Sequence, residues 1–204
     1  MDSHEVRDNW AARGGEYSPD YYAHYGPDET SEALLSVLDR SLDGAGAVLE
    51  PGCSSGRHLA HLLDNGYTDL TGIEVNGDAF DVMAETYPDL AAAGTFHHTA
   101  IEDVVEGFDD GAFDAVFSVE TLQHIHPEAE WVFAELARVT DDVLVTVENE
   151  GDGPDDLGGV NYVKDGVPLY YRDWQAIFTD LGMTQVDHRR GDRDEFRVFR
   201  WPDA

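Results

Sequence analysis

A strand, a glycine-bearing turn and a helix follow one another within residues 47–63, and this stretch carries the clearest chemistry in the sequence. An apolar run ends in Glu50, and the turn after it contains Gly52 and Gly56 before leucines recur at helical spacing. The glycines let a ligand approach the main chain, and the amides at the helix start attract polar or anionic groups. Glu50 repels a pyrophosphate and attracts a ligand that carries an ammonium group.

Glycine spacing separates the two ligand classes that use this architecture. Dinucleotide sites have the pattern G-x-G-x-x-G, whereas serines stand at positions 54 and 55 here. The turn resembles motif I of the class I S-adenosylmethionine-dependent methyltransferases, (D/E)-x-G-x-G-x-G, with the residues E-P-G-C-S-S-G. It departs from that motif at Ser54, where a glycine often stands. The resemblance implies S-adenosylmethionine as the cofactor, held by Glu50, Gly52, Cys53, Ser54 and Gly56.

A second acidic residue ends the next predicted strand, 70–74. Glu74 follows Gly52 by 22 residues (74 − 52). A carboxylate at about this distance hydrogen-bonds ribose hydroxyls in doubly wound sheets, because ligands bind beyond the carboxyl ends of the strands. The alternative is a solvated loop acid. We interpret Glu74 as a ribose ligand, with Val75 beside it in the cofactor site.

The third strand is predicted at 94–98, and residues 101–103, which follow it, are candidates for the adenine site. The resemblance implies that an acidic residue here receives the adenine amino group while apolar neighbours flank the ring. Either Glu102 or Asp103 fits the first role, and Ile101 fits the second. Two adjacent histidines end the strand, but adjacent strand residues face opposite sides, so we predict no metal site.

A polar loop follows the predicted fourth strand, 113–117. The residues F-D-A-V-F-S and then L-Q-H-I are similar to motif IV and its extension in small-molecule methyltransferases. The resemblance implies that backbone at Ser118 and Val119 lines the methionine part of the cofactor. Glu120 and His124 are the side chains expected to meet the acceptor. His124 could act as a general base, and packing at a helix entry is the alternative.

Aromatic residues are concentrated in the polar segment 1–28. They predict either a helical arm that covers the sheet or a lid over the site, with Tyr21, Tyr22 and the later Tyr171 as lid or substrate candidates. We therefore divide the chain into this N-terminal aromatic arm and a methyltransferase domain at 29–204. The segment 148–164 is rich in glycine and acids, which predicts a mobile substrate loop or disorder.

The rest of the pattern predicts an α/β fold. Helical spacing occurs at 29–42, 77–87, 130–140 and 174–181, and strands are expected at 143–147, 183–188 and 195–201. The resemblance implies a Rossmann-like, doubly wound, seven-stranded and mostly parallel sheet. Its C-terminal hairpin strand is expected to be antiparallel, with helices on both faces.

The charge balance limits the choice of partners. The chain has 12 Lys and Arg against 43 Asp and Glu, a formal net charge of −31, which repels nucleic acids and anionic membranes. Acids spread along the whole chain are typical of a salt-adapted organism, and we expect a haloarchaeal, cytoplasmic protein. Cys53 is the only cysteine, so no internal disulfide forms. No apolar stretch predicts a signal peptide or a transmembrane span.

These features together predict methyl transfer from S-adenosylmethionine to a small-molecule acceptor by in-line displacement. We expect a monomer or a homodimer. A non-catalytic protein that binds S-adenosylmethionine as a sensor or partner subunit is the first alternative. An NAD(P)-dependent oxidoreductase is the second, and the glycine spacing and Glu50 speak against it.

Overall fold

Apolar runs form the strands of one seven-stranded sheet in the order β3-β2-β1-β4-β5-β9-β8. The computed structural model describes residues 1–42, 46–153 and 156–202. The strands are β1 Ala47–Pro51, β2 Asp69–Glu74, β3 Thr95–His98, β4 Phe113–Val119, β5 Thr140–Glu148, β8 Thr184–Arg190 and β9 Glu195–Arg200. Strands β1 to β5 are parallel, and β9 is antiparallel to both β5 and β8. The predicted Rossmann-like sheet is confirmed.

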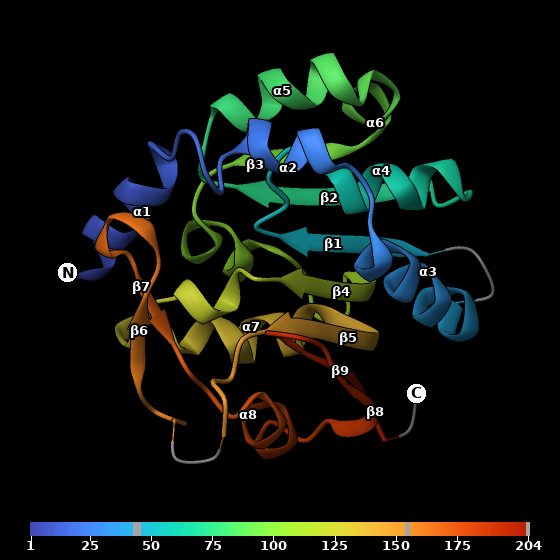
Figure 1. The fold of residues 1–204 in the computed structure, drawn as a ribbon. Coiled ribbons are helices and arrows are strands. Elements are labelled where there is room, and N and C mark those ends of the chain that lie inside the picture. The colour runs from blue at the N-terminus through green and yellow to red at the C-terminus, as the bar shows by residue number, and fades with distance from the viewer. Residues whose placement is uncertain (43–45, 154–155, 203–204) are drawn as a thin grey trace.

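Helices cover both faces of this sheet (Figure 1). Strand side chains alternate between the faces, so that Val48 packs with one core and Leu49 with the other. The first core includes side chains of α3 Glu29–Leu42, α4 Arg57–Asp64, α5 Asp78–Thr86 and α6 Pro88–Ala93. The second includes those of α7 Trp131–Val139 and α8 Trp174–Asp180. Each fully buried leucine or phenylalanine contributes about 1.5–3 kcal/mol, which fixes the sheet as a rigid base for its loops.

Two segments differ from expectation. The helix predicted at 77–87 is followed directly by a second one, α6, which begins at Pro88 because proline is tolerated in the first turn of a helix. The segment 148–164 contains an ordered part, since β6 Val160–Tyr162 pairs with β7 Pro168–Tyr170. The expectation of disorder is therefore wrong for β6, and a mobile substrate loop stays a prediction. Short 3-10 turns lie at Ile101–Asp103, Val105–Gly107, Leu122–His124, Pro127–Ala129 and Lys164–Gly166.

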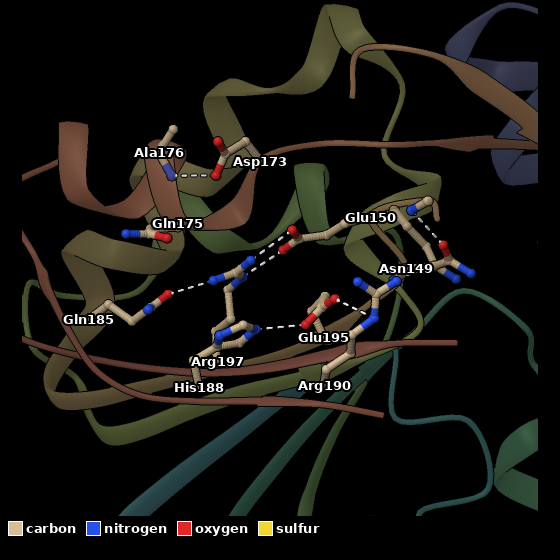
Figure 2. Close-up of polar contacts among 12 residues, drawn as sticks. Asn149, Glu150, Asp173, Gln175, Ala176, Gln185, His188, Arg190, Glu195 and Arg197 are labelled. Atoms are coloured by element: carbon tan, nitrogen blue, oxygen red, sulfur yellow. Dashed lines mark hydrogen bonds and ion pairs between the residues drawn. The ribbon is translucent and has the colours of Figure 1, made fainter. Parts of the chain in front are cut away.

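A buried ion pair fastens the C-terminal hairpin to the end of β5. Figure 2 shows Arg197 of β9 between Glu150 and Gln185, with both carboxylate oxygens of Glu150 accepting, at 2.6 and 2.8 Å. Gln185 accepts a third hydrogen bond from the guanidinium at 2.8 Å. On the same hairpin His188 lies 2.6 Å from Glu195. The arginines near the C-terminal end of the sequence, such as Arg190 and Arg197, thus pair with acidic side chains.

The N-terminal arm lies at the carboxyl ends of the parallel strands. It contains α1 Ser3–Ala11 and α2 Pro19–Tyr25. In Figure 1, α1 and the β6–β7 hairpin lie on the side to which the arrowheads of β1, β2, β4 and β5 point. Doubly wound sheets bind ligands at that edge. Within the described ranges, no helix is long and apolar enough to cross a membrane.

Candidate active site

A cavity opens at the carboxyl ends of the strands, beneath the N-terminal arm. It encloses about 1290 Å³ of empty space, open solvent at its mouth included. The walls come from the β1–α4 turn, the end of β2, the segment 99–102, the loop after β4 and the arm. This is the edge at which the sequence analysis places its cofactor and acceptor residues.

The β1–α4 turn requires backbone conformations that favour glycine. Gly52 has φ +74°, and a Cβ on it would collide with the side chain of Thr121. Ser54 has φ +49°, which explains why a glycine often stands at this place in the motif. Gly56, with φ +81°, lies outside the cavity lining and lets Leu90 approach the start of α4. The main chain at Gly52, Cys53 and Ser54 thus faces the cavity.

Glu50 brings a buried carboxylate to this turn. Its side chain is 2% exposed, and its Oε2 has no hydrogen-bond partner among the described residues. Burial and the nearby Glu74 raise the pKa of Glu50 well above its usual value, while Arg57 opposes the rise. A ligand ammonium at this carboxylate would satisfy the oxygen and lower that pKa. The residues present therefore fit the amino group of S-adenosylmethionine.

Glu74 is held rigidly at the end of β2. Its two oxygens accept hydrogen bonds from the backbone N–H of Ser54, at 2.9 Å, and of Asn76, at 2.7 Å. Burial nevertheless raises the pKa of Glu74. Each carboxylate oxygen can accept a further bond, so the side chain is oriented for a vicinal pair of ribose hydroxyls. Val75 lies beside it in the cavity wall.

The two candidates for the adenine amino group have different surroundings. Glu102 and Ile101 line the cavity. Asp103 lies outside the lining, and its carboxylate accepts from the Arg7 guanidinium of α1 at 3.4 Å. The 3-10 turn at 101–103 separates neighbouring side chains by about 120°, so only one of the two acids can face the ligand. The geometry favours Glu102.

The loop after β4 places Glu120 in the cavity wall with φ +49°. Its carboxylate lies 3.8 Å from the guanidinium of Arg193, which comes from the β8–β9 turn. Val119 also lines the cavity, whereas Ser118 is buried and its hydroxyl donates to Glu148 at 2.7 Å. A non-glycine residue at positive φ costs about 1–3 kcal/mol and is concentrated at functional sites.

His124 faces the cavity in a fixed tautomer. Its Nδ1 lies 2.9 Å from the carbonyl oxygen of Pro168 and must donate to it, because a carbonyl can only accept. The lone pair is therefore on Nε2. Burial lowers the pKa of His124 to about 4, so the ring is neutral at pH 7. Its ring also packs against Trp10 of α1, with 4.6 Å between ring centroids.

The arm contributes aromatic residues, but not all of those expected. Tyr22 lines the cavity beside Arg57, whose guanidinium lies 5.1 Å from the ring centroid. Tyr17 also lines it, with φ +64°. Tyr21 lies outside the lining and packs among the other tyrosines of the arm. Tyr171 is likewise outside, with its hydroxyl accepting from Asn161 at 2.8 Å.

The sequence analysis missed Glu148 and Arg172, which hold the loop that carries His124. Glu148 is fully buried and accepts from Ser118 and from the backbone N–H groups of residues 121, 122 and 123. Arg172 donates to the carbonyl oxygens of Leu122 and Ile125, at 3.3 and 2.6 Å. A negative charge at the start of this turn and a positive charge at its end match its backbone dipoles. The acid at the end of an otherwise apolar strand was the available signal for Glu148.

The strand order, the glycine turn and the acids at the ends of β1 and β2 agree with the resemblance drawn from the sequence. They resemble the architecture of the class I S-adenosylmethionine-dependent methyltransferases. Over the described residues, no group of three His, Cys, Asp or Glu side chains is placed to hold a metal ion.

Comparison with known proteins agrees with this class. Residues 48–142 match the family described as "Methyltransferase domain". The chain is 30% identical to the chloroplastic tocopherol O-methyltransferase of Arabidopsis thaliana over 140 residues, 61% of this chain and 39% of the relative. The chain spans about two fifths of the length of the curated relatives it matches.

Solved structures share the fold over nearly the whole chain. A Burkholderia thailandensis 1,6-didemethyltoxoflavin-N1-methyltransferase, bound to S-adenosylhomocysteine, has a TM-score of 0.75 at 17% identity and covers 98% of this chain and 91% of its own. A Synechocystis magnesium protoporphyrin IX methyltransferase with bound S-adenosylmethionine has a TM-score of 0.68 at 16% identity, covering 98% of both chains. Residues 48–142 thus resemble a methyltransferase domain, and the chain shares its fold with solved S-adenosylmethionine-dependent methyltransferases.

Proposed function

We propose that the protein transfers a methyl group from S-adenosylmethionine to a small-molecule acceptor. The observation that carries the proposal is the buried Glu50 carboxylate, which has an unpartnered oxygen beside the glycine turn. A buried carboxylate without a partner is costly, and a ligand ammonium removes that cost. The O-methyltransferase relatives and the methyltransferase neighbours support the same reaction.

The cofactor-binding roles follow the geometry of the cavity. S-adenosylmethionine, when bound, supplies an electrophilic methyl group on a sulfonium sulfur. Glu50 would bind its amino group, Glu74 its ribose hydroxyls, and Glu102 its adenine amino group against Ile101. Residues 52–54 line the cavity, so the ligand would lie close to the turn. The chain's work is thus mainly orientation, which lowers the entropic part of the barrier.

Two groups are available to the acceptor. Glu120 offers a carboxylate at the cavity wall, and His124 offers the Nε2 lone pair. With a pKa of about 4, His124 is a weak base that remains a good hydrogen-bond acceptor at pH 7. We assign orientation of the acceptor to His124 and proton acceptance to Glu120. The arm residues Tyr17 and Tyr22 would close over the bound ligands as a lid.

A pair of ligands tests the assignment of Glu50. S-adenosylhomocysteine has an amino-acid end, whereas 5′-methylthioadenosine has the same adenosine and sulfur without it. Glu50→Gln should weaken binding of the first by roughly tenfold or more, the worth of a charge-assisted hydrogen bond, and leave the second unchanged. Glu106→Gln, at an exposed position outside the cavity, is the control.

Calorimetry gives both affinities, and mass spectrometry of acceptors incubated with methyl-labelled S-adenosylmethionine detects transfer. If Glu50→Gln weakened binding of both ligands equally, the assignment of Glu50 to the amino group would be wrong. Tight cofactor binding without transfer to any acceptor would favour the sensor or partner subunit. The halophilic origin and the cytoplasmic location rest on the sequence alone and stay predictions, and so does the monomeric or homodimeric state.

A further inference from the structure

A second buried polar atom in the cavity wall lacks a partner. The Nε1–H of Trp10 is screened from solvent and has no hydrogen-bond acceptor among the described residues. Trp10 lines the cavity together with Glu50, which bears the other unpartnered atom discussed above. Buried polar groups are nearly always paired, so each exception calls for a ligand or a structural reason. Glu50 is explained by the cofactor, and Trp10 is not.

Two side chains pack against the ring of Trp10. The Trp10 ring packs on the His124 ring, with 4.6 Å between their centroids. The guanidinium carbon of Arg13 lies 4.8 Å from the centroid of the Trp10 ring. The arm around it is anchored, because the Nδ2 of Asn76 donates to the carbonyl oxygen of Arg13 at 3.0 Å. Asn76 follows Glu74 and Val75 in the cofactor half of the cavity, and its bond to Arg13 anchors the arm there. Trp10 in turn contacts His124 of the loop after β4, so the arm connects the two parts of the cavity.

Trp10 and His124 together present a donor beside an acceptor. Trp10 offers Nε1–H, which can only donate. His124 offers Nε2, which accepts because Nδ1–H is engaged with Pro168. The side-chain amide of Gln123 donates a long hydrogen bond to that nitrogen, at 3.4 Å, and a ligand hydroxyl would replace it. Because the two rings pack with 4.6 Å between their centroids, a ligand that satisfies both groups carries its donor and its acceptor close together.

We propose, resting on the methyltransferase function above, that the acceptor is a hydroxyl compound with a second oxygen on the adjacent carbon. Before transfer the hydroxyl would donate to His124 Nε2, and the second oxygen would accept from Trp10 Nε1–H. During transfer the hydroxyl oxygen would bond to the methyl carbon as the bond from that carbon to the sulfonium sulfur breaks. The hydroxyl proton would pass to Glu120, and S-adenosylhomocysteine would be the leaving group. Tyr17 and Tyr22 add aromatic walls, which suit a flat ring. Trp10 is then a specificity-determining residue, because a site built to hydrogen-bond one group strongly rejects the analogue without it.

Two isomers test this inference: catechol, with adjacent hydroxyls, and hydroquinone, with opposite ones. The wild type should methylate catechol with kcat/KM roughly tenfold or more above hydroquinone, the worth of one buried hydrogen bond. Trp10→Phe keeps the ring and removes the N–H, so the ratio should fall to about one. Trp131→Phe, at a 41% exposed residue of α7 outside the cavity, should keep the wild-type ratio.

A second readout does not depend on turnover. With S-adenosylhomocysteine bound, catechol should shift the indole N–H resonance that disappears in Trp10→Phe, and hydroquinone should not. Equal treatment of the isomers by the wild type, transfer confined to amines, or no catechol-induced shift would overturn the inference. S-adenosylhomocysteine binding should be unchanged in all variants. If it is, any of these results overturns only the inference about the acceptor, and the proposed methyltransferase function stands.

Discussion

The buried carboxylate of Glu148 should make the stability of this protein fall between pH 5 and pH 8. Burial raises its pKa from 4.5 to about 7, although four hydrogen bonds to the carboxylate oppose the rise. A folded-state pKa above the unfolded value means that the folded protein holds the proton more tightly. The stability due to Glu148 is therefore fully present below about pH 4.5 and is lost as the pH rises through 7.

The magnitude follows from the difference in pKa. At about 1.4 kcal/mol per pKa unit, a rise from 4.5 to about 7 corresponds to roughly 3 kcal/mol. Glu148→Gln removes this titration and keeps most contacts. Its carbonyl oxygen can take the place of Oε1, which serves three donors, Ser118 and residues 121 and 122. The amide NH₂ then faces the N–H of Gln123, which costs about 1–3 kcal/mol at every pH.

Urea denaturation at pH 5, 6, 7 and 8 measures the effect, in molar potassium chloride so that self-repulsion of the surface acids is screened. The free energy of unfolding of the wild type minus that of Glu148→Gln should fall by about 2.5 kcal/mol from pH 5 to pH 8, because a small part of the full difference lies outside this range. Asp194, whose pKa burial also raises to about 7, contributes to both proteins and cancels. Glu85→Gln, an exposed position on α5, should give a constant difference. A constant difference for Glu148→Gln as well would refute the reasoning.

Two further predictions concern the turn and the hairpin. Gly52→Ala should weaken S-adenosylhomocysteine binding by more than tenfold in calorimetry, because the new methyl group collides with Thr121 and alanine disfavours φ +74°; an unchanged affinity would show that the turn adapts. Arg197→Ala should lower the free energy of unfolding by about 3–5 kcal/mol in urea, because Glu150 is left buried without its partner. Arg189→Ala, an exposed arginine of the same hairpin, should cost under about 0.5 kcal/mol, and equal losses would contradict the account.

Local pattern predicted the strands and the acids that end β1 and β2, and the resemblance implied the sheet that holds them. Apolar runs, glycine turns and the resemblance each refer to residues close together in sequence, and a sheet edge brings them together automatically. The same logic placed Glu120 and His124 at the cavity wall.

Contacts between distant segments could not be read from the sequence. Asp103 pairs with Arg7, and the ring of Trp10 packs on His124, because α1 crosses the strand ends. Spacing in the sequence does not predict such a crossing. The β6–β7 hairpin was hidden by its glycines and acids, since its pairing depends on main-chain hydrogen bonds and not on an apolar pattern.

Calorimetric titration with S-adenosylhomocysteine and NAD, on the wild type and on Glu74→Ala, tests the central claim most directly. The wild type should bind S-adenosylhomocysteine and not NAD. Glu74→Ala should bind it at least tenfold more weakly, because the carboxylate held by Ser54 and Asn76 no longer meets the ribose. A folded wild type that binds NAD and not S-adenosylhomocysteine would contradict the account and point to the oxidoreductase alternative.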